Sequence, residues 1–260
     1  MIKLTFLGTG TSQGVPVIAC DCEVCRSTDT RDKRLRTSAL LEIDGKVLLI
    51  DAGPDFRQQL LRAEVKQLNA ILLTHEHKDH TAGLDDVRAF NHITGRPIDI
   101  YAEARALDAL KKEYNYVFAE HTYPGSPKMA LHTIDERPFD VEGIRIEPVR
   151  VWHYRLPIFG FKIGRLAYIT DAKTIDAAEC EKLKNLDVMV LNAVRHGTHL
   201  SHFSLEEALT FITEMKPRRA YITHLSHRLE KHAELQSWLP QNVFLAYDGL
   251  VVESEHKPID

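Results

Sequence analysis

An apolar run that ends at three histidines and an aspartate constrains this chain more than any other feature. Leu72–Thr74 is followed by His75, His77, Asp79 and His80 within six positions. Alternation would place His75 and His77 on one side of an extended chain end, where two imidazoles can bind one ion at about 2.0–2.1 Å. Asp79 and His80 would then be free to bind a second ion. Imidazole with carboxylate suits zinc, manganese or iron better than calcium or magnesium, so the pattern predicts a metal site.

Length and composition limit the class of fold. The chain has 260 residues, enough for one large α/β domain with a sizeable core. Its hydrophobic content of 44%, charged content of 27% and net charge of −4 are ordinary for a globular protein. The stretch 1–11 has no long apolar core and no cleavage site, so we expect no signal peptide, no membrane anchor and a cytoplasmic protein. The mild acidity argues against a general nucleic-acid binder.

The cysteines are arranged for metal binding. Cys20, Cys22 and Cys25 lie within six residues, a spacing that in a cytosolic protein favours a metal site over a disulfide framework. Three thiolates leave a tetrahedral zinc site one ligand short, and a histidine from elsewhere is the expected fourth. Cys180 lies in a helical pattern and is expected to be a packed side chain.

The first third of the chain predicts a mixed α/β fold. Alternation predicts a strand over 2–7, and the glycine-rich stretch 8–14 that follows lacks the lysine of a phosphate-binding loop, so we expect a tight turn. The charged segment 29–36 is expected to be a solvated linker. Asp44–Gly45 between two apolar runs predicts a β-hairpin with a type I′ turn. A helical stripe over 56–68 and a buried strand over 70–74 complete the strand–helix–strand order.

The segment 91–137 is the hardest to interpret. Helices are predicted over 84–91 and 104–116, and we expect a variable helical insert around 91–137 that covers the site and shapes substrate choice. Its candidate pocket residues are aromatic or imidazole side chains, although such residues at near-helical spacing more often belong to a core. They are Tyr114, Tyr116, Phe118 and His121.

Three further strands end in residues that bind metals. Apolar runs end directly at His153, at Asp171 and at His224, just as the earlier run ends near His75. Because α/β enzymes place their sites beyond the carboxyl ends of strands, we expect these side chains to meet at one rim.

These features resemble the signature of the metallo-β-lactamase superfamily. The pattern Thr-His-x-His-x-Asp-His over 74–80, the turn Asp51-x-Gly53 and the later strand ends carry the resemblance over nearly the whole chain. It implies an α/β fold, the αββα four-layer sandwich, as a single domain over 1–260, with Asp51 supporting the ligands from behind. The implied ligands are His75, His77 and His153 for one metal, Asp79, His80 and His224 for the other, and Asp171 as the bridging carboxylate.

The glycine-rich turn and the cysteine triplet resemble one subfamily, the phosphodiesterase of phosphonate breakdown that opens a ribosyl cyclic phosphate. That subfamily carries a separate structural zinc. The resemblance implies that the zinc ligands here are Cys20, Cys22, Cys25 and His227.

The same subfamily has a general acid just before a late helix. His202 matches that position, because Ser204 and Glu207 predict a capping box that fixes the helix start beside it. A positioned imidazole can protonate a departing alkoxide. His196 and His199 are alternatives, and we prefer His202.

The resemblance implies a binuclear hydrolase. We expect two catalytic divalent metals, zinc or manganese, one structural zinc, and a metal-bridging hydroxide that attacks the phosphorus of a small linear or cyclic phosphodiester. Asp79, as a metal ligand, and His202 are the residues expected to act in catalysis. The aspartate at the bridging position, where the lactamases commonly have cysteine, argues against antibiotic breakdown. We expect a small-molecule partner, no membrane and no nucleic acid, and leave open a homodimer.

Other functions remain open. A pyrroloquinoline quinone biosynthesis protein of this superfamily shares the fold and a cysteine cluster. A tRNA-processing nuclease shares the histidine core but needs a basic surface and a tRNA-gripping arm, which the sequence lacks. A glyoxalase-type thioesterase has no use for His202, and flavodiiron proteins usually have glutamate in place of His77. A non-catalytic zinc module would leave the second ligand set unexplained.

Overall fold

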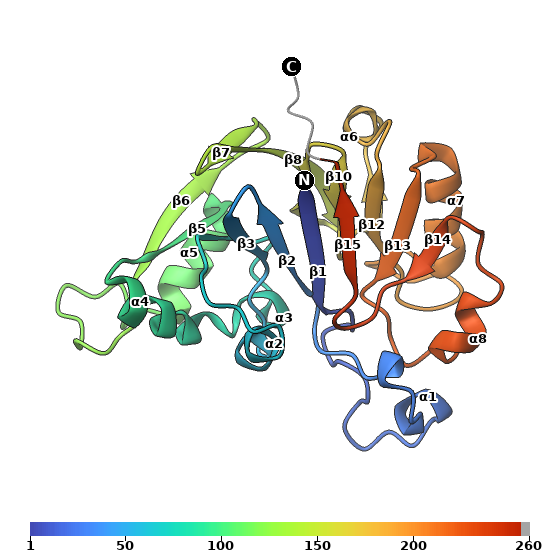
Figure 1. Cartoon of the computed structure of the whole chain (residues 1–260), viewed down its shortest axis with the longest axis horizontal. Coiled ribbons are helices and arrows are strands. Elements are labelled where there is room, and N and C mark those ends of the chain that lie inside the picture. Colours follow the sequence, from blue (N-terminus) through green and yellow to red (C-terminus); the bar gives the residue numbers. More distant parts are fainter. Residues whose placement is uncertain (256–260) are drawn as a thin grey trace.

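Two β-sheets packed face to face form the centre of the protein, seen in a computed structural model that describes residues 1–255 (Figure 1). The first sheet has seven strands, and three of its neighbouring pairs, from β3 to β6, are parallel. In spatial order its strands are β15 (Val251–Ser254), β1 (Ile2–Gly8), β2 (Ser38–Ile43), β3 (Lys46–Ile50), β4 (Ala70–Leu72), β5 (Ile98–Glu103) and β6 (Met129–Ile134).

The second sheet has eight strands. Its long antiparallel hairpin is joined to a parallel group, whose strands are continuous apolar runs because both faces are buried. In spatial order the strands are β11 (Thr174–Ile175), β8 (Ile144–His153), β9 (Leu156–Ile163), β10 (Leu166–Tyr168), β12 (Val188–Asn192), β13 (Arg219–Thr223) and β14 (Val243–Leu245), and β7 (Phe139–Val141) pairs with β8.

Helices cover the outer face of each sheet, which gives the four layers predicted from the sequence (Figure 1). On the first sheet lie α2 (Phe56–Arg62), α3 (Lys78–Thr81), the short 3-10 helix η2 (Leu84–Val87), α4 (Arg88–Thr94) and α5 (Ala104–Glu113). On the second lie α6 (Ala177–Lys182), α7 (Leu205–Met215) and α8 (His232–Gln236). The turns α1 (Glu23–Arg26) and η1 (Thr30–Asp32) belong to the loop after β1.

Apolar packing holds the layers together. One buried cluster fills the space between the sheets and includes Phe6 from the first sheet and Phe159, Phe161 and Tyr168 from the second. Each sheet also has one buried cluster between its outer face and the helices that cover it. Truncating a buried aromatic residue such as Phe159 to alanine would cost about 3–5 kcal/mol of stability. No helix within residues 1–255 is long and apolar enough to cross a membrane.

Local sequence signals explain several elements. Asp44 and Gly45 both have positive φ, as a two-residue type I′ hairpin turn between β2 and β3 requires. The predicted capping box is present at the start of α7, where the Ser204 hydroxyl accepts from the Glu207 amide at 3.2 Å and the Glu207 carboxylate accepts from the Ser204 amide at 2.8 Å.

Two predictions about segments are wrong. The segment 91–137 is not a helical insert, because β5 and β6 within it extend the first sheet beside β4. The residues of β5 alternate between buried and half-buried, a strand pattern that the sequence interpretation overlooked. The segment 29–36 is not a solvated linker, since Asp32 and Arg34 are buried. Arg34 donates to the Thr9 hydroxyl at 2.9 Å and to the Ala246 carbonyl at 2.6 Å, so its buried guanidinium has hydrogen-bond acceptors.

Candidate metal centre

The predicted ligands lie together just beyond the ends of strands from both sheets. His75 and His77 follow β4, His153 ends β8, Asp171 follows β10, and His224 follows β13. This end of the sandwich, near α1 and α3, lies opposite the N-terminus (Figure 1). The rim predicted from the strand endings is therefore present in the fold.

The backbone at this rim is strained. Asp51, Asp171 and His224 all have φ between 55° and 61°, a region that costs non-glycine residues of order 1–3 kcal/mol. Position 53 requires glycine, because the Cβ of any other residue there would collide with the Asp79 carbonyl oxygen. The chain holds these conformations where strands turn into ligand-bearing loops, as functional sites commonly do.

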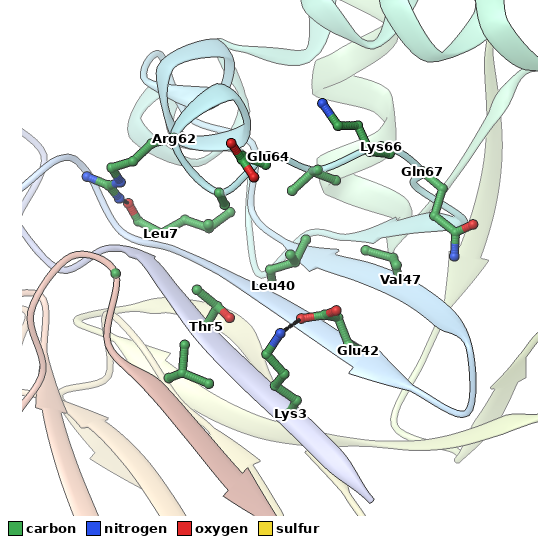
Figure 2. Close-up of a pocket in the computed structure, with 14 residues that line it drawn as sticks. Lys3, Thr5, Leu7, Leu40, Glu42, Val47, Arg62, Glu64, Lys66 and Gln67 are labelled. Atoms are coloured by element: carbon green, nitrogen blue, oxygen red, sulfur yellow. Dashed lines mark hydrogen bonds and ion pairs between the residues drawn. The ribbon is translucent and has the colours of Figure 1, made fainter.

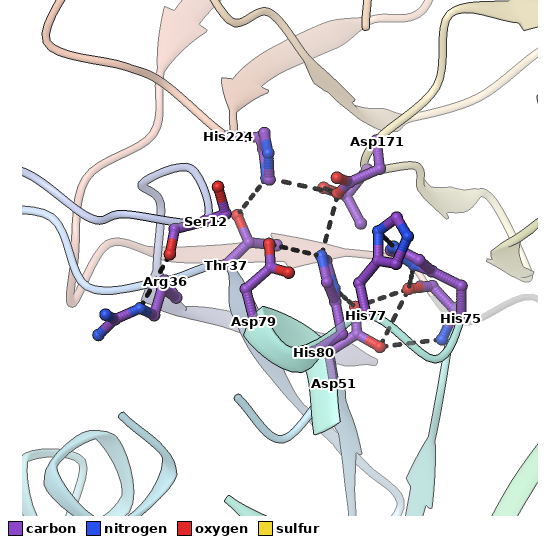
Figure 3. A network of polar contacts seen from close by, with 12 residues as sticks. Ser12, Arg36, Thr37, Asp51, His75, His77, Asp79, His80, Asp171 and His224 are labelled. Carbon is purple, nitrogen blue, oxygen red and sulfur yellow. Dashed lines mark hydrogen bonds and ion pairs between the residues drawn. The ribbon is translucent and has the colours of Figure 1, made fainter. Parts of the chain in front are cut away.

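His75, His77 and His153 form a three-histidine group. One nitrogen from each ring lies within 4.8 Å of the others, and Nε2 of His75 is 3.0 Å from Nδ1 of His77. Figure 3 shows the first two rings side by side. Three converging nitrogens at these separations fit one ion.

The other predicted ligands form a neighbouring group around Asp171. Asp79, Asp171 and His224 lie within ligand distance of one another, as do His75, His80 and Asp171. Nε2 of His80 lies 3.2 Å from Asp79 and 3.3 Å from Asp171 (Figure 3). Although both carboxylates are close, neither is aligned for a hydrogen bond with this buried nitrogen, which fits an atom that faces a metal position.

Hydrogen bonds behind the ligands fix which nitrogen faces the group. Nδ1 of His80 donates to Asp51 at 2.7 Å, and Nδ1 of His153 lies 2.9 Å from the carbonyls of Asp171 and Ser201. Thr74 donates its hydroxyl to Asp51 at 2.9 Å and accepts from Nδ1 of His75 at 2.9 Å. Each of these rings thus keeps Nε2 free for a metal, as outer hydrogen bonds do in metal sites. Asp51 has the supporting position that the resemblance implied, whereas the part of Thr74 was not predicted.

Charges in the group are strongly coupled. Burial would lower the pKa of His80, but Asp51, Asp171 and Asp79 outweigh it and hold that pKa well above its usual value. Burial would raise the pKa of Asp171, but His224 and His80 keep that pKa well below its usual range. Burial lowers the pKa of His224 to about 4. The carboxylate of Asp171 is therefore ionised and its neighbour His224 is neutral, the forms in which these groups bind metals. His80, whose pKa is raised, would release a proton when a metal binds its Nε2.

The cysteine triplet meets the histidine that the resemblance implied. Cys20, Cys22, Cys25 and His227 place their ligand atoms within 4.8 Å of one another, with Nδ1 of His227 3.2 Å from the Cys20 sulfur and 3.5 Å from the Cys22 sulfur. A hydrogen bond from the Cys25 amide is the main cause that lowers the pKa of Cys22 to about 6. Three sulfurs and one nitrogen supply the four ligands of a tetrahedral zinc ion, which fits a closed structural zinc site.

His202 lies at the edge of the candidate metal-binding groups. Its Nε2 is 3.1 Å from Asp171, its ring stacks on His224 at 5.0 Å between centroids, and its Nδ1 is 3.2 Å from Nδ1 of His199. His196 instead forms hydrogen bonds with Glu206 and Glu230. Of the three candidates for a general acid, His202 directly contacts Asp171, a predicted metal ligand. His199 contacts His202 but not Asp171.

A cavity of about 320 Å³ opens beside these groups. Its lining includes Arg195 and Arg228, and none of the described lining residues is acidic. No carboxylate in residues 1–255 forms an ion pair with either arginine. The cavity is lined by Thr11, Ser12, Gln13, Val194, Arg195, His199, His202, His224, Ser226, His227 and Arg228. Sequence analysis missed both arginines, because only the fold brings them beside His202.

The insert residues proposed for a pocket do not gather at this cavity. Tyr114 is buried and donates to the Thr81 carbonyl at 2.9 Å, so it belongs to the packing around α3. Tyr116 and His121 line a separate cavity with Asp85 and Arg88, and Phe118 packs against the core of the first sheet.

A larger cavity, about 560 Å³, lies between α2 and the outer face of β1 and β2 (Figure 2). The ion pair between Lys3 and Glu42, at 2.6 Å, crosses its floor. Its described lining residues include no histidine or cysteine, and of its two carboxylates, Glu42 and Glu64, the first is paired with Lys3.

Comparisons with known proteins agree with this geometry. Residues 46–225 match the model of the beta-lactamase superfamily domain. The crystal structure of a new diphosphatase from the PhnP family superposes with a TM-score of 0.92 and 39% identity, covering 98% of this chain and 99% of that one.

Two curated relatives give different names. A Porphyromonas gingivalis protein named octanoyltransferase is 43% identical over 261 residues, covering 99% of this chain and 53% of that protein. The Ribonuclease Z of Acaryochloris marina is 32% identical over 168 residues, covering 62% of this chain and 47% of that one. The chain thus spans about half the length of the curated relatives it matches.

Proposed function

The chain belongs to the metallo-β-lactamase superfamily of hydrolases, and we propose that it is a binuclear metal-dependent phosphodiesterase acting on small phosphodiesters. The observation that carries this proposal is the pair of adjacent metal-binding groups around Asp171. The donors are imidazole and carboxylate, which suit zinc or manganese. When bound there, two divalent ions would neutralise charge on phosphate oxygens and activate a water for attack on phosphorus.

The chain's own residues supply the rest of the reaction. His75, His77 and His153 would hold one ion, Asp79, His80 and His224 the other, and Asp171 would lie between them. His202, beside Asp171 and open to the cavity, would give its proton to the leaving oxygen. Asp51 and Thr74 keep the ligand rings in place.

The cavity favours an anionic substrate. Arg195 and Arg228 give its described lining a positive charge with no acidic residue to offset it. A phosphodiester keeps its negative charge throughout the reaction, so this field would attract the substrate. The volume, about 320 Å³, lies within the range of small-molecule sites.

A third ion, a structural zinc, would bind Cys20, Cys22, Cys25 and His227. Because His227 also lines the cavity, this zinc would fix one wall of the substrate site as well as the loop that contains α1. We also propose that the protein acts in the cytoplasm on a free small molecule.

A panel of substrates for the metal-loaded chain tests the proposal. We expect turnover of bis(p-nitrophenyl) phosphate and of a cyclic nucleotide, with much slower cleavage of a thioester, an octanoyl ester and a precursor tRNA. The panel also separates the two alternative functions. Cleavage of tRNA alone would support a nuclease, and no hydrolysis of any ester would support a role in cofactor biosynthesis.

A further inference from the structure

A chain of alternating charges begins between two residues of the three-histidine group and runs from the first sheet to the second. Glu76, the residue between His75 and His77, pairs with Arg105 near the start of α5. Arg105 also lies 3.4 Å from Glu103, which in turn accepts from Arg150 of β8 at 2.8 Å. Acidic and basic side chains thus alternate from the segment after β4 to β8.

Arg105 links both segments that deliver the three histidines. Its Nη1 contacts Glu76, and its Nη2 donates to the Pro157 carbonyl at 2.7 Å. Pro157 belongs to β9, where it pairs with Trp152, and the next pair in the register joins Leu156 to His153. One guanidinium therefore contacts the turn between two ligands and the strand that fixes the third.

The contacts are specific to a guanidinium. Two nitrogens at a fixed angle reach a carboxylate and a carbonyl at once, which a lysine ammonium on its flexible stem reproduces poorly. Glu76 and Arg105 are partly buried, with 22% and 35% of the side chain exposed, so the pair is shielded from much of the solvent.

A backbone hydrogen bond already joins the segments that deliver the three histidines, since the Phe159 amide of β9 donates to the Thr74 carbonyl at 3.2 Å. The Arg105 contacts add a second link, at the residue between His75 and His77. His75 and His77 lie in a loop, since β4 ends at Leu72. They come from the first sheet and His153 comes from the second, so a small shift between the sheets would separate the donors. The Asp51 contacts act on the first sheet alone, through Thr74 and His80.

We infer that Arg105 is a positioning residue for the three-histidine group, acting through Glu76 and the Pro157 carbonyl. The inference deepens the proposed function and rests on it, because it assumes that this group binds one of the two catalytic ions. Arg105 touches no predicted ligand atom and has no part in the chemistry itself. Its effect is to hold three nitrogens from two sheets at the separation that one ion requires.

Cobalt(II) titration of the metal-free full-length chain tests this inference without any assay of activity. His77→Ala identifies the binding phase of the three-histidine group, Asp79→Ala that of the neighbouring group, and the thiolate absorption that of the cysteine site. We expect Arg105→Met to weaken the three-histidine phase about 10- to 100-fold and to leave the other two phases unchanged. Arg105→Lys should recover part of the loss. Arg145→Met, which removes an exposed arginine of β8 paired with Asp140, is the matched control.

Glu76→Gln keeps the shape of the acidic partner and provides a second test should Arg105→Met fail to fold. It should weaken the same phase, and combining both changes should weaken binding no further than Arg105→Met alone, because the two residues act together. Unchanged or uniformly weakened phases in both variants would overturn the inference. A wild-type chain with no three-histidine phase would overturn it together with the proposed function, whereas a normal wild-type titration with unaffected variants would overturn the inference alone.

Discussion

The carboxylate of Asp51 accepts a hydrogen bond from Nδ1 of His80 at 2.7 Å, and both side chains are fully buried. The contact leaves Nε2 of His80 facing Asp79 and Asp171. An aspartate that precedes the histidine cluster by more than twenty residues thus determines which atom of His80 is available to a metal.

Replacing Asp51 with asparagine should weaken metal binding at the Asp79–His80–His224 group about 10- to 100-fold. The amide is a weaker acceptor than the carboxylate, and it can also present its NH₂ group to the ring. Competition with a chelator measures the change. Asp108→Asn, on the exposed face of α5, should leave affinity unchanged. Equal affinities for Asp51→Asn and wild type would show that this contact does not orient His80.

Cys22→Ser should lower the melting temperature and remove one zinc per chain, with a smaller effect on turnover per folded molecule. A closed zinc site contributes folding free energy and has no open position for a substrate. Calorimetry, elemental analysis and a phosphodiester assay on the same preparation separate these effects. Cys180→Ser, in α6 and outside the four-ligand group, is the control. A stable but inactive Cys22→Ser would place the cysteines in the reaction.

Arg228→Met should raise KM for a phosphodiester about 5- to 30-fold, which corresponds to about 1–2 kcal/mol of lost binding free energy, with a smaller effect on kcat. The guanidinium lines the cavity, where its charge would attract the proposed anionic substrate. The dependence of kcat/KM on salt should also become shallower, because one attracting charge is gone. Arg145→Met is again the control. An unchanged KM and salt dependence would remove Arg228 from the substrate site.

Stability should depend on pH through His196. Burial would lower the pKa of His196, but hydrogen bonds to Glu206 and Glu230 outweigh it and raise that pKa. The extra stability is therefore complete below the unfolded pKa, about 6.5, and is lost as pH rises through the higher folded pKa. Relative to wild type, His196→Gln should be less stable at pH 6 and nearly equal at pH 9. Denaturant unfolding at both pH values measures this, with exposed His92→Gln as the control. A constant difference between the two pH values would contradict it.

His202→Ala should keep the metals and lose roughly 10²- to 10⁴-fold in rate on a diester with an alkoxide leaving group. The loss should shrink for a nitrophenolate, which departs without needing a proton. The ratio of the two losses is independent of errors in protein concentration. Equal losses on both substrates would assign His202 to substrate binding and leave the acid role to His199, 3.2 Å away.

The histidine cluster and the strand endings could be predicted because their signals are local, and the four-layer fold followed from the superfamily resemblance that they carry. His75, His77, Asp79 and His80 lie within six residues, and the strands that end at His153, Asp171 and His224 are marked by apolar runs. The structure brings all of these together, as it does the cysteine triplet and His227. Their positions along the chain predict which residues are metal ligands without knowledge of the packing.

What could not be predicted depends on contacts between distant residues. The pairing of Glu76 with Arg105 and the burial of Arg34 require the finished fold, and in the sequence these residues look like ordinary surface charges. The strand β5 does not stand out from the expected helical insert, because a short strand buried on one face and followed directly by a helix gives an ambiguous pattern. The strand β6 is mostly half-buried and has no clear apolar alternation. Arg195 and Arg228 were missed for the same reason as Arg105.

Metal reconstitution tests most directly the claim that the chain is a binuclear metal-dependent phosphodiesterase. The chain is stripped by a chelator, supplied with one zinc per molecule for the cysteine site, and titrated with manganese or zinc while hydrolysis of bis(p-nitrophenyl) phosphate is followed. The account predicts no hydrolysis at the start, full activity when two further ions are bound, and no recovery at any metal concentration for Asp171→Ala. Hydrolysis that survives metal removal, or a chain that holds all three ions and cleaves no phosphodiester, would contradict it.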